Sequence, residues 1–362
     1  MPRVIGIDPG TVSLDLCGLD DGNLFLDRAL PTDQALASPS AIVGLLSAAS
    51  PLDLVVGPSG YGLALTRAGE LTDEDLRLAY LAPEGESGGI GGLRSLMLAL
   101  AHTSLPIVLT PGVVHLRSVP AHRKVNRVDM GTADKVCVAA LAVREQADRR
   151  GCGERDVSFM LLELGGAFTA ALAVRDGTIV DGLGGTSGPL GVRAAGALDG
   201  EVACLAGSIT KQLLFGGGVA TIAGTPDATP EALAAPSTIR GRLAWEAYIE
   251  SAVKAVAAMA VAMPCPCDVI LSGRVAGIQA VRDVLTRHLT NTLTVRSVHV
   301  LSGFAAAAKH AAQGAALLAD GLAGGRSAAI VETLGIREAG GTALDHLHVI
   351  TRAQARKRLG LA

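Results

Sequence analysis

The first residues that could do chemistry are Asp8-Pro9-Gly10-Thr11, which directly follow the short apolar run Val4–Ile7. A run of this kind predicts a buried strand, and the Pro-Gly pair predicts a tight turn at its end. Glycine lets main-chain amides approach an anion closely, and the Thr11 hydroxyl adds a donor. The turn therefore predicts a phosphate site with a metal ion beside Asp8, although the same residues also fit a turn that only reverses the chain.

Two later stretches share this design. Residues 161–191 contain a second strand that ends in an acid, Glu163, followed by the glycine turn Gly165-Gly166-Ala167 and a hairpin. Residues 269–271 form a third apolar run, which passes through Ser272-Gly273-Arg274 into a predicted helix. A glycine at such a joint permits close approach of a ligand, and a tight strand-to-helix connection alone would also require it.

With these three stretches in this order, the chain resembles the superfamily of acetate and sugar kinases, Hsp70 and actin. The resemblance covers nearly the whole chain, and the pattern at 182–201 and in the Ala- and Gly-rich C-terminal helices is most similar to a group of predicted butyrate kinases. It implies an α/β fold of two ribonuclease-H-like (actin-like ATPase) domains with a nucleotide cleft between them.

The resemblance also implies ligands and roles. The cofactors would be ATP and Mg2+. Asp8, Gly10 and Thr11 in the first turn and Gly165, Gly166 and Ala167 in the second would hold the phosphates, and Gly273 and Arg274 would hold the adenosine. The metal ion would lie beside Asp8 and Glu163.

Two sites of charge are candidates for catalysis. Arg127 and Asp129 belong to the densest polar cluster of the chain, just before a predicted helix over 132–149. A basic residue beside a carboxylate could neutralise an anionic acceptor and orient or deprotonate the attacking oxygen, whereas a solvated salt-bridge cluster is the alternative. The resemblance implies that Asp129 lies near the transferred phosphate and that Arg193, after the 184–191 glycine loop, stabilises the charge that develops during transfer.

Two departures from the acyl kinases bear on the acceptor. Where those enzymes carry an amide in the first turn and a basic residue in the following strand, this chain has Asp8 and Asp15. Where they carry a histidine ahead of the second glycine loop, it has Glu163. Carboxylates next to a triphosphate favour metal coordination over direct phosphate contact. The nucleotide site is therefore better supported than butyrate as the acceptor.

The leading hypothesis is an ATP-dependent kinase, a phosphotransferase that acts on a small-molecule acceptor. The acceptor would be a short-chain carboxylate, as in a butyrate kinase, or a hydroxyl compound, as in the sugar kinases. The alternative is a nucleotide-gated ATPase switch or assembly protein of the Hsp70 or actin type. The resemblance further implies a homodimer.

Composition limits the partners and the compartment. The formal net charge of −3 and the lack of Lys/Arg runs interleaved with aromatics argue against nucleic acid as a partner. Ala and Gly inflate the mean hydropathy of +0.41, and no apolar run is long enough to span a membrane. The N-terminus enters a strand without a signal-peptide pattern, and the six scattered cysteines, Cys265-Pro266-Cys267 included, fit reduced thiols in the cytoplasm.

A chain of 362 residues favours two domains. We expect an N-terminal domain over 1–150, a C-terminal domain over 151–350 and a tail helix over 351–362. Among the elements we expect are helices over 35–49, 93–102, 237–263 with Ser237 as its cap, 276–289 and 305–322, a flap-like loop over 84–92 and a surface loop over 226–236.

Overall fold

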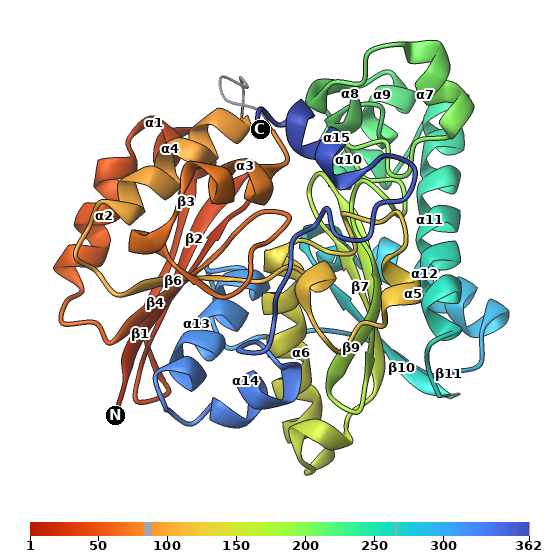
Figure 1. Cartoon of the computed structure of the whole chain (residues 1–362). Helices are drawn as coiled ribbons and strands as arrows, with labels where there is room; N and C mark the ends of the chain where they lie inside the picture. The colour runs from red at the N-terminus through yellow and green to blue at the C-terminus, as the bar shows by residue number, and fades with distance from the viewer. Residues whose placement is uncertain (83–88, 265, 362) are drawn as a thin grey trace. The chain divides into compact units, whose positions relative to one another are not determined.

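The computed structural model describes residues 1–82, 89–264 and 266–361 (Figure 1). By its internal contacts the chain divides into two compact units, each a mixed α/β structure. Unit 1 comprises Met1–Val128, Thr132–Asp156 and Ser302–Ala362, and unit 2 comprises Asp129–Gly131 and Val157–Leu301.

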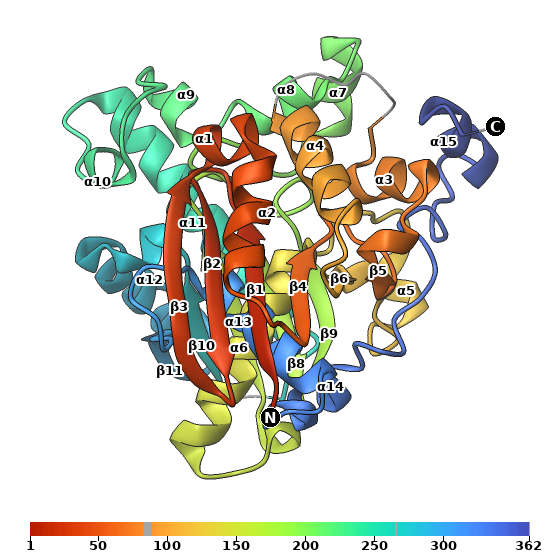
Figure 2. The ribbon, with the colours of Figure 1, turned by 90° about the vertical axis from the view of Figure 1, so that its left-hand side faces the viewer.

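Unit 1 contains a six-stranded sheet in the order β3-β2-β1-β4-β6-β5, and Figure 2 shows its strands side by side. Strand β1 pairs antiparallel with β2 and parallel with β4, and β4 in turn pairs parallel with β6. Strands β2 and β3 follow the first turn and pair antiparallel as a hairpin. The strand bounds are β1 Arg3–Pro9, β2 Ser13–Asp20, β3 Asn23–Pro31, β4 Leu54–Pro58, β5 Thr66–Arg67 and β6 Ile107–Thr110.

The two faces of this sheet are covered differently. Ile5 and Ile7 of β1 join one apolar core with Ile42 and Leu46, which lie on the helix Pro39–Ala48. Gly6, on the opposite face, lies so close to the helix His310–Leu322 that an added Cβ would be 2.2 Å from the main-chain nitrogen of Ala316. Side chains alternate along a strand, so Asp8 points to this second face.

Unit 2 contains a five-stranded sheet in the order β11-β10-β7-β8-β9. Here β7 pairs antiparallel with β8 and parallel with β10, which repeats the arrangement of β1, β2 and β4. The repeated strand, turn and hairpin that the sequence predicts is therefore present in both units. The bounds are β7 Phe159–Leu164, β8 Thr169–Arg175, β9 Thr178–Leu183, β10 Cys267–Ser272 and β11 Val295–Val300.

The core of unit 2 forms between this sheet and its longest helix, α11 (Ile239–Ala260). Leu162 and Leu164 of β7 and Val269 of β10 share a buried cluster with Tyr248 of that helix. Burial of large apolar side chains is the main favourable contribution to folding, so this cluster fixes the ends of β7 and β10 against one another.

The helices of unit 1 are α1 Thr32–Ala37, α2 Pro39–Ala48, α3 Asp73–Tyr80, α4 Gly89–Ala101, α5 Ala121–Lys124, α6 Ala133–Arg150, α13 His310–Leu322, α14 Ala328–Leu334 and α15 Arg352–Arg358. Those of unit 2 are α7 Gly200–Ala206, α8 Lys211–Phe215, α9 Val219–Ala223, α10 Pro230–Leu233, α11 and α12 Gln279–Thr292. Short 3-10 helices are η1 Ala68–Glu70, η2 Val113–His115, η3 Glu154–Asp156 and η4 Arg274–Gly277.

The compact units differ from the domain boundaries expected at 150 and 350. Residues 302–362 belong to unit 1, because α13 packs on β1 and α6. The expected tail helix lies within this segment as α15. Sequence order alone assigned residues 302–350 to the second domain, since an apolar helix gives no indication of which sheet it covers.

Several element predictions need correction. The helix expected over 305–322 begins at His310, because the amides of Ala306, Ala307 and Ala308 donate instead to the Asp27 carboxylate. The loop expected over 226–236 contains α10, and the cap of α11 is Thr238, whose hydroxyl accepts from the amide of Gly241.

Two further expectations fall partly outside the described residues. Of the flap expected over 84–92, residues 84–88 lie outside the described part, and α4 begins at Gly89, so 89–92 are helical rather than loop. Cys265 of the Cys-Pro-Cys pair also lies outside it.

The helix expected over 35–49 is two helices, with the break at Ser38-Pro39, because proline lacks the amide that would continue the first.

Candidate functional site

The turn after β1 is a fixed structure. The Gly10 amide donates to the Asp8 carbonyl at 3.0 Å, and the Thr32 hydroxyl donates to the Gly10 carbonyl at 2.6 Å. Thr11 is exposed at the tip. The sequence-predicted trio of Asp8, Gly10 and Thr11 thus forms one turn, with its carboxylate buried and its hydroxyl-bearing residue in solvent.

Asp8 directly faces a second buried acid. Asp8 and Asp15 are paired residues across the antiparallel strands β1 and β2, so their side chains lie on the same face of the sheet. Like charges in this arrangement repel each other. Lys309, which immediately precedes α13, reaches this pair: its Nζ lies 3.1 Å from Asp15 Oδ2 and donates to the Ser13 carbonyl at 3.2 Å.

A third acid and a second lysine complete the cluster. Lys135 Nζ lies 2.5 Å from Asp134 Oδ2 at the start of α6, and the Thr132 hydroxyl donates to the other oxygen of Asp134. Burial raises the pKa of Asp8 to about 8, with a further contribution from the charge of Asp134, while Lys309 acts in the opposite direction. Burial also acts to raise the pKa of Asp134, but the attraction of Lys135 and the hydrogen bonds outweigh it and lower that pKa.

These neighbours give the carboxyls of Asp8 and Asp134 different protonation states. Asp134, with its lysine and hydroxyl partners, stays ionised, whereas Asp8 holds a proton near neutral pH. A cation brought next to Asp8 would displace that proton. Binding of a metal ion at Asp8 would therefore release a proton.

The turn after β7 is formed mainly by main-chain groups. The Gly165 amide donates to the Phe168 carbonyl at 2.9 Å, and a Cβ added to Gly165 would lie 2.7 Å from that oxygen. Gly166 is partly exposed. Gly165 thus permits a reversal that a side chain would obstruct.

The late strand-to-helix joint adjoins this turn. Strands β7 and β10 are parallel neighbours, with Ser272 paired to Glu163. Gly273 has a positive φ of 88°, and a Cβ there would lie 2.5 Å from the Leu164 carbonyl oxygen. The structure thus brings two of the predicted nucleotide-binding stretches together at one edge of the unit 2 sheet.

Arg193 is connected to the same turn through its main chain. The amides of Arg193 and Ala194 both donate to the Ala167 carbonyl, at 3.1 and 3.2 Å. The Arg193 side chain is exposed and donates from Nη1 to the Pro226 carbonyl at 3.0 Å. Gly165, Ala167, Arg193 and Gly273 are therefore neighbours within unit 2.

Asp129 is buried and heavily hydrogen bonded. Its Oδ2 accepts from both the amide and the hydroxyl of Thr186 at 2.8 Å, and its Oδ1 accepts from the Gly131 amide at 3.2 Å. Its carbonyl accepts from the Gly184 amide and the Ser187 hydroxyl. The carboxylate thus holds the 184–187 loop, a role that sequence reasoning missed; its role as a base stays a prediction.

The remaining predicted residues lie as follows. Arg127 is exposed in unit 1, three residues after α5, with its amide donating to the Lys124 carbonyl. Arg274 begins η4 and lies 3.7 Å from Glu231. Glu163 lies on β7, where it contributes to the raised pKa of Tyr248, which is caused chiefly by burial.

The described residues do not include a ready-made metal cage. Within residues 1–82, 89–264 and 266–361, no three His, Cys, Asp or Glu side chains converge in a metal-binding arrangement. Mg2+ is usually held by one or two carboxylates together with substrate phosphates and water. The buried carboxyl of Asp8, beside a glycine turn, fits that mode of binding.

Sequence reasoning missed Lys309, Asp134 and Lys135 as parts of the site. Lys309 is the lone cation between Ala305 and Ala312. This segment was predicted to be the start of an apolar helix. That isolation was the available signal, because an unpaired lysine in a small-residue run needs a partner.

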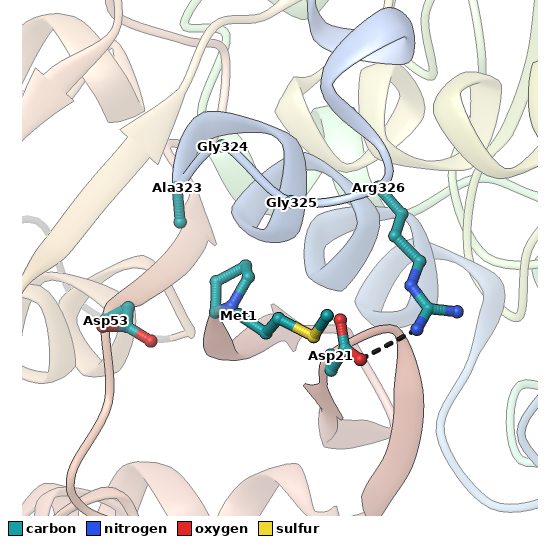
Figure 3. A pocket seen from close by; sticks show the side chains of 8 residues that line it. Met1, Asp21, Asp53, Ala323, Gly324, Gly325 and Arg326 are labelled. Carbon is teal, nitrogen blue, oxygen red and sulfur yellow. Dashed lines mark hydrogen bonds and ion pairs between the residues drawn. The ribbon is translucent and has the colours of Figure 1, made fainter.

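A surface pocket lies at the other end of β1, away from Asp8 (Figure 3). An ion pair of 2.8 Å between Arg326 and Asp21 crosses one side of it. None of the predicted site residues lines this pocket, so it has no part in the site. Its lining is formed by Met1, Pro2, Asp21, Asp53, Ala323, Gly324, Gly325 and Arg326.

Comparisons with solved structures show the fold. A propionate kinase from Francisella tularensis subsp. tularensis SCHU S4 has a TM-score of 0.62 at 13% identity, covering 87% of this chain and 99% of that one. An acetate kinase from Entamoeba histolytica has a TM-score of 0.58 at 11% identity, covering 83% and 96%. A ROK family protein from Streptococcus pneumoniae TIGR4, in complex with sucrose, has a TM-score of 0.50 at 13% identity, covering 87% and 96%.

The predicted fold class is confirmed: this is the α/β fold of the two-domain actin-like ATPases. The narrower resemblance to predicted butyrate kinases stays a prediction. No helix in the described part of the chain combines the length and the apolar character needed to cross a bilayer. A search of curated proteins gives no match. The family model DUF1464, described as a protein of unknown function, matches residues 6–349, so the chain belongs to that family.

Proposed function

We propose that this protein is an ATP-dependent kinase that transfers the γ-phosphoryl group to a small acceptor. The observation that carries the proposal is the duplicated sheet with a glycine turn at the end of each first strand, where one turn bears a buried carboxyl and the other adjoins the Gly273 corner. Phosphoryl transfer depends on positioning and on charge stabilisation rather than on covalent chemistry, and these turns offer both.

The residues of this chain would share the work as follows. Gly10, Thr11, Gly165, Gly166 and Ala167 would bind the nucleotide phosphates, while Gly273 and Arg274 contact the nucleoside. Bound Mg2+ would neutralise charge on the phosphates, and Asp8 is the carboxyl best placed to hold it, with Glu163 as a second candidate.

Three residues are proposed for the acceptor side. Arg193 would stabilise the charge that develops on the transferred group, because its side chain is exposed while its main chain is fixed to Ala167. Asp129 would orient or deprotonate the acceptor, and Arg127 would neutralise an acidic one. A carboxylate acceptor, as in the acetate and propionate kinases, and a hydroxyl acceptor are both consistent with this set.

An acceptor screen tests the proposal. Purified protein would be given ATP and Mg2+ with a panel of short-chain acids and polyols, ADP formation would be followed, and acyl phosphate would be trapped with hydroxylamine. We expect ADP formation to depend on one class of acceptor, and Asp8→Ala and Arg193→Ala each to abolish it while the chain stays folded by circular dichroism. Slow hydrolysis that ignores every acceptor would instead indicate a nucleotide-gated switch.

A further inference from the structure

Close to the first turn, strands β1 and β2 carry no cation, because Arg3 lies at the other end of β1, where it pairs with Asp20. Asp8 and Asp15 are directly opposed in β1 and β2, and both are buried. Two acids at the seat of a phosphate would repel it. Besides a metal ion, a positive charge beside this turn has to come from another segment of the chain, and of the two lysines in the cluster Lys135 is paired with Asp134.

Lys309 is placed to supply that charge. Its Nζ contacts Asp15 Oδ2 and the Ser13 carbonyl on one side, and a Cβ added to Gly10 would lie 2.8 Å from it on the other. Its side chain is 41% exposed, whereas that of Asp15 is 0% exposed. The ammonium group thus contacts a buried acid, and the side chain that carries it is partly exposed beside the turn.

Side-chain hydrogen bonds fix the main chain just before Lys309. The Asp27 carboxylate on β3 accepts from the amides of Ala306, Ala307 and Ala308. The Gln313 side chain accepts from the amides of Phe304 and Ala305. The Asp27 bonds tie the segment before α13 to the sheet that carries the turn, and the Gln313 bonds tie it to α13, so the fold determines where Lys309 lies relative to Gly10.

We propose that Lys309 forms an anion seat with the Gly10-Thr11 turn and binds a phosphate oxygen of the nucleotide through its Nζ. This inference rests on the proposed function and adds a residue to it. Asp15 is the positioning residue: its buried carboxylate holds the ammonium in place. The chain thereby supplies from residue 309 the cation that its own second strand does not carry.

The alternative is that Lys309 only neutralises the charge of Asp15. A double-mutant cycle separates the two readings, using Lys309→Met, Asp15→Asn and the combined variant. Lys309→Met leaves a buried acid without its cation, so it lowers the melting temperature. The combined variant removes both charges and regains that stability.

Binding of ATP, ADP, adenosine and inorganic pyrophosphate would be measured by calorimetry for each variant. We expect Lys309→Met to weaken ATP binding by about tenfold or more, since one charge-assisted hydrogen bond is lost, and to leave adenosine unaffected. The combined variant should stay equally weak for ATP despite its restored stability, and Lys309→Arg should retain part of the affinity. The matched control is Lys254→Met, a 74% exposed lysine paired with Glu250 on α11, which should bind ATP as the wild type does.

The outcomes distinguish this inference from the proposed function. If the combined variant binds ATP as tightly as the wild type, Lys309 is only the counter-ion of Asp15 and the inference is overturned. If the wild type binds pyrophosphate through Lys309 but not ATP, the anion seat stands and the proposed kinase fails. If it binds neither, both are overturned.

Discussion

The turn after β1 and the turn after β7 occupy the same place in two sheets of the same design, yet they differ in chemistry. The first is surrounded by ionisable groups: Asp8 is paired with Asp15 across two strands, and Lys309 Nζ lies 3.1 Å from Asp15. The second is formed by glycines and main-chain amides, with Gly273 pressed against Leu164. The same position in the sheet is thus surrounded by charged side chains in unit 1 and by close main-chain contacts in unit 2.

This difference determines how each turn can fail. A charged cluster responds to pH and to the removal of one partner, because the remaining charges become uncompensated. A turn made by close main-chain contacts responds to a single added carbon, since the interior has no room to give. The following variants probe the two kinds of dependence, from the largest expected effect to the smallest.

Gly273→Ala should have the largest effect. The methyl group would meet the Leu164 carbonyl oxygen at 2.5 Å in a backbone conformation, φ 88°, that alanine rarely adopts. Strain and overpacking together predict a loss of about 2–6 kcal/mol in the free energy of unfolding, with loss of ATP binding. Urea denaturation measures the first and calorimetry the second.

Gly277→Ala is the matched control for that variant. It lies at the end of the same 3-10 helix, and an added Cβ there has nothing within 4 Å. We expect its stability to stay within about 0.5 kcal/mol of the wild type. Equal stability of the two variants would show that the Gly273 corner is not a tight contact.

Asp8→Asn should expose the charge dependence of the first turn. Burial raises the pKa of Asp8 to about 8 in the folded protein, against 3.8 for an ordinary aspartate. Because the pKa is higher in the folded state, the proton on Asp8 contributes to stability. This contribution is fully present below the pKa of the unfolded state and is lost as the pH rises through the pKa of the folded state. The asparagine variant lacks this dependence, so its advantage over the wild type should grow between about pH 4 and pH 8.

Unfolding free energies measured at pH 5, 7 and 9 without divalent cations test this expectation. At pH 9 we expect Asp8→Asn to be more stable by about 2–4 kcal/mol. Asp33→Asn, an exposed carboxylate of α1 in the same unit, is the control. A constant difference between Asp8→Asn and wild type at all three pH values contradicts a buried, proton-holding Asp8.

The fold was largely predictable because its signals are local. The apolar run before Asp8, the Pro9-Gly10 turn and the repeated glycine turn at 165–166 announce strands and reversals within a few residues. The helix start at His310 was not predictable, because alanines favour a helix and only the distant Asp27 captures their amides. Local propensity was overridden by a tertiary contact.

The candidate site was predictable only where chemistry and spacing coincide. Gly165 and Gly273 were identified from their turns, and the structure places them together in unit 2. Lys309 was not identified, since its partner Asp15 is 294 residues away and no spacing rule links them. Asp129 was identified as reactive, but its hydrogen bonds to Thr186 come from a loop whose position the sequence does not fix.

Asp129→Asn probes a site in unit 2 where charge and shape are combined. The carboxylate accepts three hydrogen bonds, and an amide would turn one donor group toward the Gly131 or Thr186 amide. We expect a loss of about 1–3 kcal/mol in unfolding free energy. Thr186→Val, which removes only the hydroxyl donor, should lose about 1 kcal/mol.

Turnover separates the two roles of Asp129. At a temperature where both variants are folded, a base role predicts that Asp129→Asn loses at least about 100-fold in kcat while Thr186→Val stays close to the wild type. If both variants lose turnover only in proportion to their stability, Asp129 is a loop clamp and the base must be another group.

Arg274→Met should have the smallest effect on stability. The guanidinium is about half exposed, and its partner Glu231 is 3.7 Å away and equally exposed, so solvent screens the pair. A change below about 0.5 kcal/mol in unfolding free energy is expected. If Arg274 contacts the nucleotide as proposed, calorimetry should still show ATP binding weakened several-fold. A large loss of stability instead would mean that the Gly273 corner depends on charge as the first turn does, and the contrast between the two turns would no longer hold.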